Sequence, residues 1–100
     1  MTSVPIHYRD YWDRPRVFLV VRDGRWVLFD CLFEDERDEF SDHYSVGLIE
    51  PAPELLEASA DWTSIAARVV QVVGAVAVGD VSFPDRNAVD DAVLRRLDLD

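Results

Sequence analysis

The stretch RVFLVVRDGRWVLFDCLF, residues 16–33, decides the fold, because it holds two apolar runs separated by one turn signal. Asp23 and Gly24 form a preferred pair for a two-residue hairpin turn, in which both central residues take a positive φ. We therefore predict antiparallel strands at about 16–22 and 25–33. With that turn, Leu19 pairs with Leu28 on one face of the hairpin, and Phe18 pairs with Phe29 on the other.

Both faces of this predicted hairpin are apolar, whereas a hairpin with one wet face alternates apolar and polar residues. Each face therefore needs a cover. Several covers fit the sequence: helices from the second half, the aromatic arm IHYRDYW at residues 6–12, a curled small barrel, or a second copy of the chain. The sequence alone does not choose among them.

The rest of the chain predicts a third strand and one or two helices. HYSVGLIE, residues 43–50, alternates in the manner of a strand, and DVSF, residues 80–83, fits a fourth. Asp61 is a good N-cap for a helix at about 61–73, and Pro84-Asp85 can open another at about 85–97. The run at 68–83 is so rich in β-branched residues that strands fit it equally well.

We therefore predict an α+β fold in a single small domain, residues 1–100. Its expected core is a three- to four-stranded antiparallel sheet, packed by one or two helices at about 61–73 and 85–97. A chain of 100 residues with 49% hydrophobic residues is large enough and apolar enough to form such a core.

The charge balance is acidic, with 20 Asp and Glu residues against 10 basic residues and a formal net charge of −10. Nucleic acids and anionic membranes attract basic proteins, so this balance argues against both as partners. It favours a basic protein partner instead. With one cysteine, no apolar run of membrane-spanning length and no signal-peptide pattern, we expect a cytoplasmic protein.

The sequence contains none of the common catalytic motifs. It has no lysine for a Schiff base or a phosphate-binding loop, its four glycines are dispersed, and no serine-hydrolase elbow occurs. We expect no cofactor. These features favour a protein without catalytic activity.

A dense acidic segment follows the predicted hairpin. Between Phe33 and His43, Arg37 is the only basic residue and Phe40 the only aromatic one, and the acids are Glu34, Asp35, Glu36, Asp38, Glu39 and Asp42. One interpretation is a solvated loop that keeps the sheet edge soluble. The other is a docking surface for a basic protein, on which charge steers the encounter and Phe40 provides an apolar anchor.

Metal binding by the acidic segment is disfavoured, because it lacks the ligand order and central glycine of an EF-hand. One cysteine and two dispersed histidines also do not make a zinc site, so we predict no metal.

Cys31 and His43 are the weak candidates for catalysis. A simple meander with Phe33 near His43 places Cys31 opposite Ser45 and on the same face as His43. However, flanking aromatic residues favour a buried, inert thiol, and nearby carboxylates raise a thiol pKa. Asp30, if it is buried, needs a partner such as Arg14 or Arg16.

The favoured hypothesis is a small acidic interaction protein, such as an inhibitor, an immunity-type protein or an accessory subunit, that docks on a basic protein through the acidic segment. Mimicry of nucleic acid by its carboxylates is a variant of the same idea. One alternative is a small enzyme or metal-dependent protein that uses Cys31, His43 and nearby carboxylates. Another is a structural homodimer that hides one apolar face of the hairpin.

Overall fold

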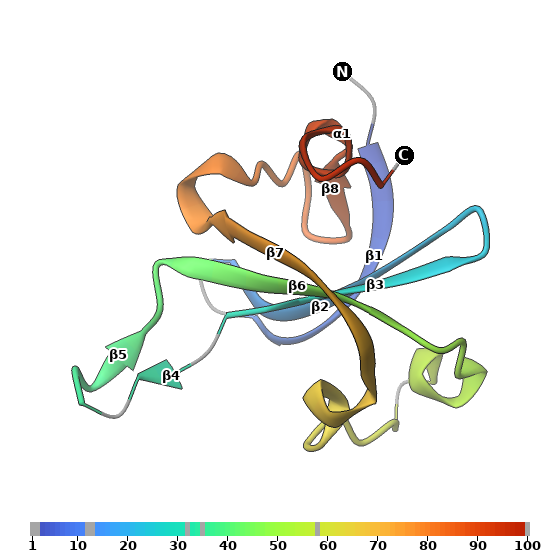
Figure 1. The fold of residues 1–100 in the computed structure, drawn as a ribbon, viewed down its shortest axis with the longest axis horizontal. Coiled ribbons are helices and arrows are strands. Elements are labelled where there is room, and N and C mark those ends of the chain that lie inside the picture. The colour runs from blue at the N-terminus through green and yellow to red at the C-terminus, as the bar shows by residue number, and fades with distance from the viewer. Residues whose placement is uncertain (1–2, 12–13, 32, 35, 58, 100) are drawn as a thin grey trace.

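The computed structural model describes residues 3–11, 14–31, 33–34, 36–57 and 59–99, and its main element is a six-stranded antiparallel sheet (Figure 1). The strand order is β7-β6-β3-β2-β1-β8, and a separate two-stranded hairpin is formed by β4 and β5. The strands are β1 (Ser3–Tyr11), β2 (Pro15–Arg22), β3 (Arg25–Asp30), β4 (Phe33–Glu34), β5 (Glu39–Phe40), β6 (His43–Ile49), β7 (Val69–Ala77) and β8 (Ala88–Asp90).

Helical structure is minor in the described part of the chain. One short α-helix, α1 (Ala92–Arg96), is joined by three 3-10 turns, η1 (Pro53–Leu56), η2 (Ile65–Arg68) and η3 (Val78–Asp80). The radius of gyration is 12.7 Å, which is close to the value expected for a compact domain of this length. The protein is thus a small, compact single domain with an antiparallel sheet.

The predicted hairpin is confirmed in its turn and its register, but its second strand ends at Asp30 and not at Phe33. Leu19 pairs with Leu28 and Phe18 pairs with Phe29 across β2 and β3. Asp23 and Gly24 take φ values of 53° and 77°, as the two-residue turn requires. Local turn chemistry therefore sets the centre of the sheet.

Each apolar face of the hairpin is covered by the chain itself. Phe18 and Phe29 stack at 4.5 Å between ring centroids and pack in a cluster with Val89, Val93 and Leu94 from the C-terminal segment. On the opposite face, Leu19 and Leu28 pack with Leu55, Trp62 and Ile65 from the segment between β6 and β7. Figure 1 shows α1 and β8 on one side of the central strands and the 3-10 turns η1 and η2 on the other.

The predicted α+β fold with three or four strands is wrong, because the sheet is larger and the helices are shorter. The N-terminal arm does not lie across a face of the hairpin but forms β1, which pairs with β2 and β8. In place of the helix expected at 61–73, η2 leads directly into β7. The run of valines from Val69 favours a strand, and β6 offers it backbone hydrogen bonds.

The C-terminal predictions need a similar correction. The helix expected at 85–97 divides into β8 and α1, with an isolated bridge between Asp85 and Ala88 before them. The strand expected at 80–83 is absent, and η3 ends at Asp80 there. Among the described residues, no helix has both the length and the apolar character needed to cross a membrane.

Candidate functional site

The acidic segment forms a short hairpin rather than an open loop. Phe33 pairs with Phe40 and Glu34 pairs with Glu39, and Asp38 takes the positive φ of 53° that closes the turn. In Figure 1 this β4–β5 hairpin projects away from the crossed central strands. The chain thus carries its densest acidic run on an arm outside the main sheet.

The turn of the hairpin is exposed. Glu36, Arg37, Asp38 and Glu39 are all exposed, and Arg37 forms a salt bridge with Glu39. In the sequence, the segment from 34 to 42 carries six acids and one arginine, which gives −6 + 1 = −5. Asp35 belongs to this set but lies outside the described residues. The segment therefore keeps a formal charge of −5 even when Arg37 is included.

Asp42 links the hairpin to the main sheet. Its backbone carbonyl accepts a hydrogen bond of 2.8 Å from the amide of Val78, and its Oδ1 lies 2.6 Å from Nδ1 of His43. The hydrogen bond with His43, followed by the charge of that ring, lowers the pKa of the exposed Asp42 carboxyl. Asp42 therefore stays ionised, as a docking surface for a basic partner would need.

The structure does not bring Cys31 and His43 together. Asp30, and not Cys31, pairs with Ser45, so the predicted register is wrong by one residue. Such a shift moves side chains to the opposite face, and Cys31 is buried in the core cluster with Tyr44 whereas His43 is exposed. The Cys31 thiol donates to the carbonyl of Ser41, and burial raises its pKa despite the nearby Arg16.

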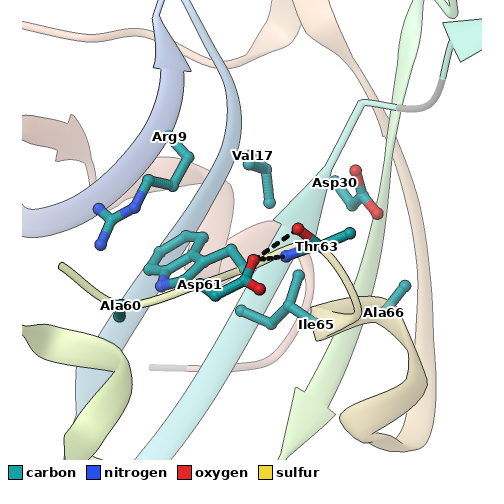
Figure 2. Close-up of a pocket in the computed structure, with 9 residues that line it drawn as sticks. Arg9, Val17, Asp30, Ala60, Asp61, Thr63, Ile65 and Ala66 are labelled. Carbon is teal, nitrogen blue, oxygen red and sulfur yellow. Dashed lines mark hydrogen bonds between the residues drawn. The ribbon is translucent and has the colours of Figure 1, made fainter.

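A second candidate site is a hollow on the face of the sheet that η1 and η2 cover, beside the loop that precedes η2 (Figure 2). It has a volume of about 410 Å³. Its polar lining consists of Arg9 from β1, Asp30 from the end of β3, and Asp61 and Thr63 from the loop. Its other lining residues are Val17, Ala60, Trp62, Ile65 and Ala66.

One side of this hollow is fixed by a dense set of contacts. The Arg9 guanidinium lies 4.6 Å from the centroid of the Trp62 ring and donates to the carbonyls of Tyr8 and Glu57. The indole nitrogen of Trp62 in turn donates to the carbonyl of Leu55 at 3.1 Å. Arg9 and Trp62 therefore form a rigid wall, with the arginine held by backbone acceptors.

The two carboxyls that line the hollow are in different environments. Asp61 accepts hydrogen bonds from the backbone and the hydroxyl of Thr63, and these bonds lower its pKa. Asp30 is half-buried, and burial raises its pKa. Among the described residues no hydrogen bond or salt bridge reaches the Asp30 carboxyl, so the expected pairing with Arg14 or Arg16 is absent. In Figure 2, Asp30 and Arg9 lie on opposite sides of the hollow.

A second, more apolar hollow of about 250 Å³ adjoins the first, and the two share Asp30 and Ala66. Leu28, Gly47, Val69 and Val72 are among its lining residues. Asp30 therefore stands between a polar hollow and an apolar one. In the sequence, the sign of this site is one acidic residue, Asp30, at the end of an apolar run. No local pattern predicts the position of the loop that completes the site.

Within the described ranges, no group of three or more His, Cys, Asp or Glu side chains is arranged to hold a metal ion. No protein-family model, curated protein or solved structure matches this chain. The function therefore has to be inferred from the surfaces themselves.

Proposed function

We propose that this chain is a non-enzymatic interaction module whose β4–β5 hairpin docks on a basic surface of a partner protein. The observation that carries this proposal is the exposed turn Glu36 to Glu39 on an arm that projects from the sheet (Figure 1). Exposed charges of one sign attract a partner of opposite sign and raise the association rate.

The environment of the hairpin supports this role. Asp42 extends the acidic surface to the base of the arm, and its lowered pKa keeps it charged. The backbone bond from Val78 and the bond from Cys31 to the carbonyl of Ser41 fix that base. A fixed base orients the acidic arm, so less conformational entropy is lost when a partner binds.

The experiment compares two variants with equal net charge. In the first, amides replace five hairpin acids: Glu34→Gln, Asp35→Asn, Glu36→Gln, Asp38→Asn and Glu39→Gln. In the matched control, amides replace five exposed acids elsewhere: Asp23→Asn, Glu50→Gln, Glu54→Gln, Glu57→Gln and Asp98→Asn. Both chains carry −10 + 5 = −5. Asn tolerates the positive φ at Asp23, Asp38 and Asp98, so both should fold.

The two variants and the wild type are used as baits in a lysate, and bound proteins are eluted with increasing salt and identified by mass. We expect the wild type and the control to retain the same basic protein and to release it as salt screens the charges. The hairpin variant should lose it. Equal capture by the hairpin variant and the control would remove the hairpin as the docking surface.

A second candidate is recognition of a cationic group by Asp30, favoured because its carboxyl is half-buried between two hollows and no hydrogen bond or salt bridge from the described residues reaches it. The test is titration with N-acetyl-arginine amide and with its neutral analogue N-acetyl-citrulline amide, followed by NMR of residues that line the hollow. Binding of the cation alone, lost in Asp30→Asn, supports this candidate. Equal shifts with both compounds, or none, count against it.

A further inference from the structure

The strand β7 is an outer edge of the six-stranded sheet. Its inner side pairs with β6, and no described strand pairs with its outer side. An edge strand of this kind presents unpaired backbone groups, which form a template for another strand unless they are blunted by charge, proline, a bulge or a cover.

Two of those protective devices are missing from β7. Residues 69–79 contain no charged residue and no proline, and this is the longest uncharged run in a chain of net charge −10. Val72 and Val70 on this strand are 77% and 63% exposed, the highest values for large apolar side chains in the described part of the chain. The edge is therefore both neutral and apolar.

The strand does contain two irregularities, where Val70 and Val73 are extra residues opposite β6. Bulges are one way in which proteins blunt an edge. Here they leave the pairing regular from Gly74 to Ala77, where four consecutive residues match His43 to Val46. About half of the strand thus keeps an undistorted edge.

The outer strand at the opposite end of the sheet, β8, is short and partly covered. It has three residues, and the amide of Asp90 donates to the carbonyl of Ser82 on the neighbouring segment. Of the two described strands that end the six-stranded sheet, β7 is therefore the longer and the more open. Pairing of this same edge between two copies gives a closed two-fold dimer.

The lack of charge along β7 favours a second copy of the chain as the occupant. The charged residues at its two ends already have partners within the chain, because Arg68 lies 3.6 Å from Glu54 and Asp80 lies 3.2 Å from Arg96. Residues 69–79 carry no charge, so two copies of this acidic chain can approach at this edge without charge repulsion along it.

We propose that β7 pairs edge to edge with β7 of a second copy in an antiparallel, two-fold dimer. This surface is distinct from the hairpin, so the proposal does not depend on docking to a basic protein. It also differs from a dimer through an apolar face of the β2–β3 hairpin, because the chain itself covers both of those faces.

The test is analytical ultracentrifugation of the whole chain over a wide concentration range. Val72→Lys and Val72→Glu introduce opposite charges on the edge, and Leu56→Lys and Leu56→Glu introduce the same charges on η1. We expect the wild type and both Leu56 variants to dimerise, and both Val72 variants to weaken the dimer at least about tenfold, because a charge is then desolvated at the interface.

The Lys and Glu variants together distinguish strand pairing from association controlled by surface charge. In an acidic chain, charge-controlled association would be strengthened by Lys and weakened by Glu, whereas strand pairing should be weakened by both. Circular dichroism and urea unfolding show that the variants are folded, and if either Val72 variant does not fold, Val70→Lys and Val70→Glu replace the pair. A wild type that is monomeric at every concentration overturns the proposal. So does a dimer that survives all folded edge variants unchanged.

Discussion

The β4–β5 hairpin and the β7 edge are both peripheral, but they differ in the one property that decides what can bind to each. The hairpin segment carries six acids and one arginine, whereas residues 69–79 carry no charge. Two hairpins repel one another and suit a partner of opposite sign, whereas two β7 edges meet without repulsion at their centre. In so acidic a chain, a neutral strip is the surface that suits self-association.

The substitution with the largest expected effect on stability tests whether β7 packs on β6 as an integral part of the fold. A Cβ atom at Gly47 would lie 2.6 Å from Cγ1 of Val69, so Gly47→Ala pushes β7 away from β6. We expect a loss of about 1–3 kcal/mol in the free energy of unfolding, measured with urea. The matched control is Gly79→Ala, where the added Cβ has no atom within 4 Å.

A second substitution tests whether the clash with Val69 causes the loss of stability in Gly47→Ala. Val69→Ala in the Gly47→Ala background removes the clashing methyl groups and should restore part of the lost stability. If Gly47→Ala and Gly79→Ala unfold at the same urea concentration, β7 does not pack on β6 as described.

The next largest effect on stability is expected from a substitution at Asp30. This residue ends β3 just before the hairpin segment and lines a hollow with Val72 of β7. Burial raises the folded-state pKa of Asp30, so its protonated form favours folding. The stability that protonated Asp30 contributes is fully present below the pKa of Asp30 in the unfolded chain. It is lost as pH rises through the pKa of Asp30 in the folded chain. Asp30→Asn should therefore match the wild type in acid and exceed its stability at neutral pH.

Urea unfolding of the wild type and Asp30→Asn across that pH range measures the difference directly. An Asp30→Asn chain that is less stable at neutral pH would show that the carboxylate has a stabilising partner, contrary to the structure.

A smaller effect is expected when the hairpin loses its charges. Glu36→Gln, Asp38→Asn and Glu39→Gln together should change the free energy of unfolding by less than about 0.5 kcal/mol, because these side chains are exposed and lie outside both core clusters. Thermal unfolding at two salt concentrations measures it. A large stabilisation would mean that charge repulsion in the hairpin strains the whole fold.

The smallest effect is local to the junction of the hairpin with β6. His43→Ala removes the hydrogen bond and the charge that lower the pKa of Asp42, so that pKa should rise toward its ordinary value. An NMR titration of the carboxyl carbon gives the value in each protein. An unchanged Asp42 pKa would show that the two side chains do not interact in solution.

The centre of the fold could be predicted from the sequence because its signals are local. The Asp23-Gly24 turn sets the register of β2 and β3 without help from the rest of the chain. The prediction failed at β7, where valines at helical spacing also suit a strand, and where partners on β6 decided the outcome. It also failed at β1, because the alternation in HYRDY is weak and its pairing partners are distant in sequence.

The features of the candidate site also divide into those that local sequence predicts and those that depend on distant residues. Exposure of Glu36, Asp38 and Glu39 follows from charge density and could be predicted. Whether Cys31 and His43 share a face depended on the register of β3 and β6 across the acidic segment, and the observed register differs from the predicted one by one residue. The hollow at Asp30 requires the loop at 60–66 to fold over β3, which no local pattern specifies.

The most direct test of the account is hydrogen–deuterium exchange of the wild-type chain at low and high protein concentration, resolved by residue. We predict that amides in Val69–Ala77 become more protected as concentration rises, while those of the hairpin turn Glu36 to Glu39 exchange equally fast at both concentrations. Unchanged protection in β7, or protection that appears in the hairpin instead, would contradict the assignment of self-association to the neutral edge.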